Sequence, residues 1–342
     1  MLRYRRLLPV LLGLALVLPA ATADAQSTRV PLSYDAPELA DVGRLAWRGG
    51  LQLSGDADWF GGLSALEFDE SSETLIALTD RGVWLRLAIE HDARGFLRAA
   101  HPVIARPLDD VDGRPFRRKA DRDSGSLAGL PDGGFVVAFE QRHRLLAYPP
   151  AEPPFARRPY YLGLPPGLYG APGNGGLEAL VALADGRLLA LSEKLYLKDG
   201  TALGWLGDGR RWMPLRYRTG TDFSATGATR LPSGDVLVLE RRLSLVGGFA
   251  ARLVRLTQVA IEAADADPAS SLVGDEIALL QAPLNMDNFE GIATRRAANG
   301  ETLIYLVSDD NFFALQRTLL FAFALRDTPV STALPEPRQP PK

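Results

Sequence analysis

Acidic residues follow a series of short apolar runs along this 342-residue chain. Each run comes after a polar or Gly-containing start and a tight turn, as in Gly175-Gly176-Leu177-Glu178 followed by the run Leu188–Ser192. The acids that end the five runs are Asp80, Glu140, Glu193, Glu240 and Asp309, the last of which is followed by Asp310. Carboxylate and amide oxygens that converge from several segments are the ligands that a hard cation such as Ca²⁺ prefers.

We therefore predict a calcium site built from the acids and from polar residues at the segment starts. Ser64 belongs to the wider candidate set, and the predicted metal ligands are Asn174, Glu178, Asn288, Glu290, Asp80, Glu193 and Glu240. The predicted catalytic residues are Glu178, Glu290 and Asp309. Without a cation, converging carboxylates would repel each other and partly protonate. The alternative is structural: the acids cap turns or pair with neighbours such as Arg81, Arg142, Lys194 and Arg241.

The composition excludes several other kinds of site. The sequence has no cysteine, which rules out disulfides, thiol catalysis and cysteine-ligated metals. Three histidines, none close to another in sequence, argue against a histidine-rich metal centre. A formal net charge of −3 argues against a nucleic-acid partner. No nucleotide-binding or G-x-S-x-G motif occurs.

The spacing of the repeated segments predicts an all-β propeller. The terminal acids are 47 to 69 residues apart, and a four-stranded blade takes roughly 40–50 residues plus any insertions. Turns such as Asp185-Gly186 between apolar runs are typical of hairpins. We expect six blades, the sixth shared between strands near Arg44 to Leu53 and Thr318 to Leu325, which would close the ring. A two-domain β protein and a seven-bladed ring are the alternatives.

The chain ends differ from the part between them. Residues 1–25 are typical of a secretory signal peptide: Arg3, Arg5 and Arg6 precede an apolar run, and Ala23-Asp24-Ala25 fits a cleavage site. A membrane anchor is the alternative, but the run is shorter than the roughly 20 residues a bilayer needs. We predict a propeller over 26–328, a disordered Pro-rich tail over 329–342, and a periplasmic or secreted monomer that has no membrane attachment after cleavage. The export route stays open between the general and twin-arginine pathways.

Two further features have alternative interpretations. The charged segment 109–123 is either a solvated loop or a lid over a charged site. His143 is either a general base or a histidine with a structural role.

Several of these pieces, in this order, resemble the phytase-like family, described as having esterase-like activity. The resemblance spans about Gly61 to Leu325, and its most specific pieces are Thr79-Asp80-Arg81-Gly82, Gly176-Leu177-Glu178, Leu237–Arg241, Asp287–Gly291 and Ser308–Phe312. It implies a propeller, export and hydrolysis of ester or phosphoester bonds. Where the family tends to have Asp-x-Glu before the second inner strand, this chain has Asp123-Ser124-Gly125.

Two functions remain open at this point. The first is an exported, calcium-dependent hydrolase of small-molecule esters or phosphoesters, and a lactonase would satisfy the same chemistry. The second is a non-catalytic periplasmic propeller that binds a ligand or a protein.

Overall fold

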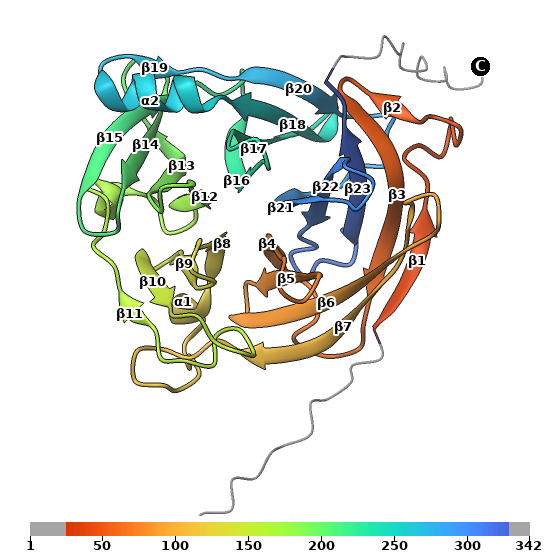
Figure 1. Cartoon of the computed structure of the whole chain (residues 1–342), viewed down its shortest axis with the longest axis horizontal. Coiled ribbons are helices and arrows are strands. Elements are labelled where there is room, and N and C mark those ends of the chain that lie inside the picture. Colours follow the sequence, from red (N-terminus) through yellow and green to blue (C-terminus); the bar gives the residue numbers. More distant parts are fainter. Residues whose placement is uncertain (1–24, 328–342) are drawn as a thin grey trace, which may run out of the picture.

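The chain forms a ring of five β-sheets around a central channel (Figure 1). The computed structural model describes residues 25–327. The innermost strands of the five sheets are β4 (Leu63–Asp69), β8 (Ser124–Gly129), β12 (Leu177–Ala182), β16 (Ser224–Arg230) and β21 (Phe289–Arg296). Each of these packs against the next, and β21 packs against β4 to close the circle. The predicted propeller is confirmed, but the predicted blade number is wrong: there are five blades instead of six.

The first two blades are four-stranded antiparallel sheets. Blade one consists of β4, β5 (Thr74–Thr79), β6 (Val83–His91) and β7 (Leu97–Pro107). Blade two consists of β8, β9 (Phe135–Phe139), β10 (Arg144–Tyr148) and β11 (Tyr160–Tyr161). A single helical turn, α1 (Lys119–Arg122), precedes β8, and a 3-10 turn, η1 (Leu168–Gly170), precedes β12.

Blades three and four are linked by an exchanged segment. Blade three contains β12, β13 (Leu188–Tyr196), β14 (Ala202–Gly207) and β15 (Trp212–Tyr217), and blade four contains β16, β17 (Val236–Ser244), β18 (Gly248–Leu256) and β20 (Asp275–Leu280). Between β18 and β20 the chain forms α2 (Gln258–Ala266) and β19 (Ser271–Leu272), which pairs in parallel with β15 of blade three. The sequence analysis did not predict α2, which begins at the Thr257 cap and buries Ile261 and Ala264.

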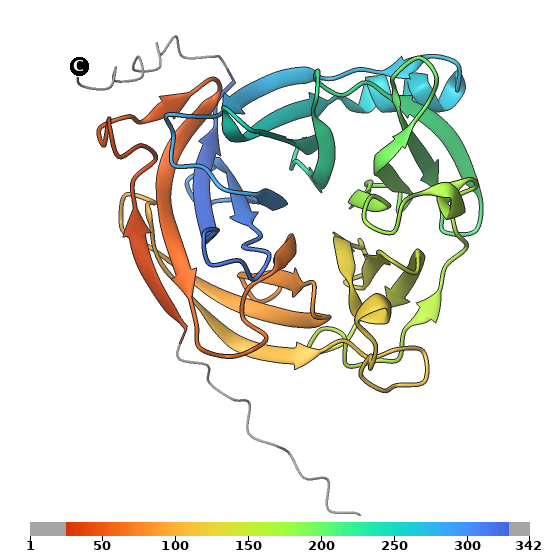
Figure 2. The same cartoon turned by 180° about the vertical axis from the view of Figure 1, so that it is seen from behind.

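Blade five joins the two ends of the described chain, and this explains the wrong blade number. It contains β21, β22 (Thr302–Ser308) and β23 (Thr318–Leu325), completed by β3 (Leu45–Ser54) and β1 (Gln26–Val30); β2 (Asp41–Val42) pairs with β3. The predicted closure is confirmed, because β3 pairs with β23 from Leu53↔Thr318 to Leu45↔Leu325. The terminal strands complete the fifth repeat, so none of the strands in residues 25–327 remains for a sixth blade. Figure 2 shows this joint from the other side.

The strands follow directly from the apolar runs and turns of the sequence. Each predicted run forms the second strand of a blade, and the hairpin before it is tight: the Gly186 amide donates to the Leu183 carbonyl at 3.0 Å. Gly186 has a φ of +84°, which a residue with a Cβ rarely adopts. Matching turns precede β9, β17 and β22. Apolar side chains from both faces of these strands fill the core between neighbouring blades.

Some predictions fall on residues that the structure does not describe. The predicted tail 329–342 lies outside the described residues, and so does the predicted signal peptide except for Ala25. No helix between residues 25 and 327 has the length and apolar character needed to cross a bilayer.

Candidate functional site

A bulge in every innermost strand points one residue per blade toward the channel. The register with the second strand skips one residue in each blade. The skipped residues, in blade order, are Ser64, Gly125, Glu178, Thr226 and Glu290. A bulge leaves its extra residue unpaired and redirects the side chain, which is why bulges occur beside functional sites. Two predicted residues, Glu178 and Glu290, therefore occupy equivalent positions in blades three and five.

A second set of side chains comes from the ends of the second strands. In four blades the backbone amide of the acid donates to the residue just before the innermost strand: Asp80 to Gly62, Glu140 to Asp123, Glu193 to Gly176 and Asp309 to Asn288, at 2.8–3.0 Å. In blade four the residue paired with the corresponding Ser224 is Arg241. Four carboxylates and one guanidinium thus hold equivalent positions.

Except for Thr226, the residues of both sets line one cavity of about 570 Å³ at this end of the channel. The predicted residues that line it are Ser64, Asp80, Glu140, Asn174, Glu178, Glu193, Glu290 and Asp309. Asp123, Gln141 and Asn311 also contribute, with the basic residues Arg81, Lys119, Arg122, Lys194 and Arg241. Lys119 and Arg122 belong to α1, so the charged segment 109–123 contributes to the cavity wall.

Asn288 and Glu240 take other places. Asn288 is buried beside the cavity, and its Nδ2 donates to Glu290 Oε1 at 2.9 Å. Glu240 is fully buried inside blade four, where Tyr217, the Gly220 amide and Arg252 donate to it. It lies one residue before the channel-facing position, and one residue in a strand separates its two faces.

Five of the seven cavity carboxylates have no basic partner among the ion pairs of residues 25–327: Asp80, Asp123, Glu140, Glu178 and Asp309. Burial raises the pKa of Asp80 to about 8, helped by the nearby charges of Glu290, Asp123 and Glu140. Burial, with the neighbouring Glu140 charge, raises the pKa of Glu178 well above its usual range. Burial, with Glu290 and Asp80, does the same to the pKa of Asp309. These groups either hold protons or await a cation.

Glu178 is the clearest of these groups. Its side chain is 8% exposed and faces the cavity, it forms no ion pair in the described part of the chain, and its side-chain hydrogen-bond partner is another acid, Glu140. Glu140 Oε1 accepts the backbone amides of Gly175 and Gly176 at 2.8 and 3.2 Å. The two carboxylates converge on Gly125, where a Cβ would lie 3.1 Å from both Glu140 Cγ and Glu178 Oε2. Because Gly125 has no side chain, the space between the two carboxylates stays open.

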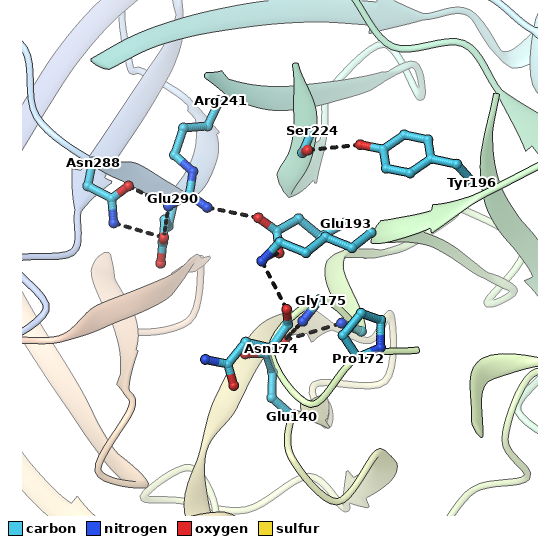
Figure 3. A network of polar contacts seen from close by, with 12 residues as sticks. Glu140, Pro172, Asn174, Gly175, Glu193, Tyr196, Ser224, Arg241, Asn288 and Glu290 are labelled. Atoms are coloured by element: carbon cyan, nitrogen blue, oxygen red, sulfur yellow. Dashed lines mark hydrogen bonds and ion pairs between the residues drawn. The ribbon is translucent and has the colours of Figure 1, made fainter. Parts of the chain in front are cut away.

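Glu193 and Glu290, by contrast, are bridged by Arg241 (Figure 3). Arg241 Nη2 donates to Glu193 Oε1 at 2.9 Å, and Nη1 donates to Glu290 and Asn288. Burial opposes the charge of Arg241, but Glu290, Glu193 and Glu178 outweigh it and raise its pKa. Burial raises the pKa of Glu290, and Arg241 counteracts that rise. The sequence analysis named Arg241 only as a possible ion-pair partner of the acids.

The donor set fits a hard cation in kind, because it consists of oxygen ligands around a buried Glu178 without a basic partner in the described chain. However, no three His, Asp or Glu side chains in residues 25–327 are close enough together to form a ready-made metal cluster. A cation would have to draw carboxylates toward it, so we expect weaker binding than at a preassembled site.

His143 lies outside this cavity. Its Nε2 is 3.1 Å from the Pro172 carbonyl, and its Nδ1 is buried without a partner in the described chain. This placement suits a histidine that supports the loop before β12.

Comparison with known proteins gives a family. A family model described as "Phytase-like: Esterase-like activity of phytase" matches residues 58–312. No curated protein matches the chain. Among solved structures, the PQQ-bound aldose sugar dehydrogenase of Streptomyces coelicolor is 11% identical, with a TM-score of 0.45 over 89% of this chain and 99% of that one. A putative gluconolactonase is also 11% identical, with a TM-score of 0.43 over 90% and 94%. Virginiamycin B lyase of Staphylococcus aureus is 7% identical, with a TM-score of 0.40 over 88% and 100%.

Proposed function

We propose that this chain, which belongs to the phytase-like family, is an exported hydrolase of ester or phosphoester bonds. Its site would be the acidic cavity, and it would use Ca²⁺ there. The match covers three quarters of the chain, and the family description names an esterase-like activity. The solved structures, all below a TM-score of 0.5, contribute nothing to this choice of chemistry.

The observation that carries the proposal is the buried carboxylate of Glu178, which faces the cavity without a basic partner in the described chain and has only another acid, Glu140, beside it. An isolated buried charge is costly, so we expect such a group to bind a cation, a proton or a substrate. Asp80, Glu178 and Asp309 are the residues that would hold Ca²⁺. When bound, the ion would polarise the scissile oxygen and make a bound water more acidic.

The chain's own residues would manage protons and substrate charge. Burial and the neighbouring Glu140 charge raise the pKa of Glu178, so Glu178 would hold a proton and exchange it with the substrate or water. Asp309 and Glu290, also predicted to be catalytic, flank the same space. The rim cations Arg81, Lys119, Arg122 and Lys194 would attract an anionic small-molecule substrate.

Export is part of the proposal and rests on residues 1–25 of the sequence. We propose that the mature protein begins at Gln26 and acts as a monomer in the periplasm or outside the cell. Mass spectrometry of the N-terminus, after expression of the full chain and cell fractionation, tests this. An intact Met1 in the cytoplasmic fraction would contradict it.

A non-catalytic binding propeller is the second candidate function. The Arg241 bridge favours it, because two of the acids are already neutralised within the protein. Under this alternative the cavity would bind a ligand without turnover, and any calcium would only stabilise the fold.

One set of measurements separates the two candidates. Thermal melting in EGTA and then in Ca²⁺ tests the metal, since a ligand bound only to the folded state raises Tm. A screen with aryl phosphates, phosphodiesters, carboxyl esters and lactones tests turnover. For the enzyme, Glu178→Gln should abolish turnover and leave folding intact, while the exposed control Glu70→Gln should retain both. No turnover on any ester class would favour the binding propeller, and no Tm shift at millimolar Ca²⁺ would remove the metal from the proposal.

A further inference from the structure

Blade four carries a cation where the other four blades carry an acid. The pairing of Ser224 with Arg241 aligns this residue with Asp80, Glu140, Glu193 and Asp309. The propeller repeat therefore contains a charge reversal at one of five equivalent positions. Its guanidinium lies in the ring of carboxylates and not on the outer surface of the blade.

Three oxygen atoms converge on this single guanidinium. Glu193 Oε1 accepts from Nη2 at 2.9 Å, and Glu290 Oε1 and Asn288 Oδ1 both accept from Nη1. They come from blades three and five, so Arg241 spans from its own blade to both neighbours (Figure 3). Two carboxylates and one amide carbonyl around a positive centre are the same kind of donor set that binds Ca²⁺.

The surroundings of the three oxygens are largely closed to water. The side chains of Glu193, Glu290 and Arg241 are 6%, 13% and 22% exposed. Lys194 also reaches Glu193, at 2.8 Å from Oε2, but it is 46% exposed and touches only this one acid. Without Arg241, the Glu193 and Glu290 carboxylates would be buried with Lys194 as their single remaining basic partner in the described chain.

We propose that Arg241 is a built-in cation, which takes the place that a divalent metal ion would occupy between Glu193, Glu290 and Asn288. Resting on the proposed function, the inference adds that Arg241 restricts Ca²⁺ to the cavity carboxylates without a basic partner, among them Asp80, Glu178 and Asp309. Arg241 is then a positioning residue that sets how many metal ions the cavity accepts and where they bind.

Calcium titration calorimetry on the full chain tests this with two variants. Arg241→Ala should bind one more Ca²⁺ per chain than the wild-type protein, because three oxygen ligands lose their guanidinium. Arg241→Lys keeps a positive charge and should bind no additional ion. In EGTA the Tm of Arg241→Ala should fall below that of the wild type, and Ca²⁺ should raise it by more than it raises the wild-type value. Equal stoichiometry and equal calcium shifts in Arg241→Ala and wild type would overturn the proposal.

A double variant keeps the test valid if Arg241→Ala unfolds without metal. Arg241→Ala with Glu290→Gln removes both charges of the pair, so it should fold in EGTA and lose the additional ion. If the double variant still binds that ion, Glu290 is not its ligand and the proposal fails. A wild-type protein that binds no Ca²⁺ would contradict the calcium part of the proposed function, whereas the gain of an ion in Arg241→Ala depends on Arg241 alone.

Discussion

The Tyr217 hydroxyl of blade three donates a 2.7 Å hydrogen bond to Oε1 of the buried Glu240 of blade four. Arg252 Nη1, also at 2.7 Å, and the Gly220 amide at 3.1 Å occupy the other carboxylate oxygen. The next residue, Arg241, faces the cavity instead. Burial, with the Glu240 charge, raises the pKa of Tyr217 well above its usual range, so the hydroxyl keeps the proton that it donates. Glu240 thus contributes to the fold of blade four.

We expect Glu240→Ala to lower the free energy of unfolding by about 3–5 kcal/mol, because the Tyr217 hydroxyl and Arg252 Nη1 lose the buried carboxylate to which they donate. The matched control is Glu276→Ala, which removes the other acid bound to Arg252. The side chain of Glu276 is 48% exposed. An exposed ion pair is worth about 0–1 kcal/mol, so this loss should be small. Urea unfolding measures both, and equal losses would contradict the role given to Glu240.

The stability of the joint between β3 and β23, which closes the ring, should depend on Phe321. This β23 residue is fully buried, and its ring packs 4.9 Å from Trp47 of β3 and 5.0 Å from Phe289 of β21. Phe321→Ala should cost about 3–5 kcal/mol of unfolding free energy, since it leaves a cavity where the chain ends join. Phe313→Ala, at a ring that is 57% exposed, should change it by less than about 0.5 kcal/mol. A small loss for Phe321→Ala in chemical denaturation would show that the joint can repack.

Gly62 should tolerate no side chain. Its φ is +60°, and an added Cβ would lie 2.5 Å from the Phe312 ring. Its amide also donates to Asp310 Oδ1 at 2.8 Å, which connects blade one to the segment between β22 and β23 of blade five. We expect Gly62→Ala to lower the unfolding free energy by about 1–3 kcal/mol. Gly170→Ala is the control, because nothing lies within 4 Å of its added Cβ. Thermal melting of both variants checks this, and a wild-type Tm for Gly62→Ala would refute it.

The contact between His91 and Tyr305 should make stability depend on pH. Because Arg295 Nε donates to the Tyr305 hydroxyl at 3.0 Å, that hydroxyl is free to donate to His91 Nε2 at 3.1 Å, which requires a neutral ring. Burial, with the Arg295 charge, lowers the pKa of His91 to about 4. An unfolded histidine has a pKa of about 6.5, so the folded state binds fewer protons between these values. The contribution is complete above pH ~6.5 and is lost as the pH falls toward 4.

The size of this effect is reduced because the ring is partly open to solvent, and we expect about 1–2 kcal/mol. The measurement is the difference in unfolding free energy between wild type and His91→Gln at several pH values, which cancels other titrating acids. Gln keeps a hydrogen-bond acceptor without titrating. A difference that stays constant from pH 7 to ~4 would contradict the assignment.

The sequence predicted the architecture well, because tight turns and apolar runs are local signals. The hairpin at Asp185-Gly186 and the closing strand Thr318–Leu325 lie where they were expected. Blade number depends on which distant strands pair, and here β3 completes the repeat that begins at Phe289. The local sequence patterns of turns and apolar runs do not indicate that β3 pairs with β23.

The site was predicted less completely, since a shift of one residue along a strand reverses which side a residue faces. Glu240 ends its apolar run as the other acids do, yet the bulge at Thr226 sets a register in which Arg241 faces the channel. Aligning the bulge positions, with Glu178 and Glu290 as anchors, would have revealed Arg241. Asn288 lies buried beside the cavity and donates to Glu290 instead of lining the cavity, and this placement depends on side-chain packing that the sequence pattern does not show.

The pairing of β3 with β23 has a consequence for how the molecule is made. The ribosome produces β3 early and β23 as the last of the described strands. Nearly the whole chain must therefore be synthesised before β3 can pair with β23. Contacts so distant in sequence form slowly, and unpaired strand edges promote aggregation in the meantime. A nascent chain truncated before Thr318 would therefore be an open arc with β3 and β22 lacking the strand between them.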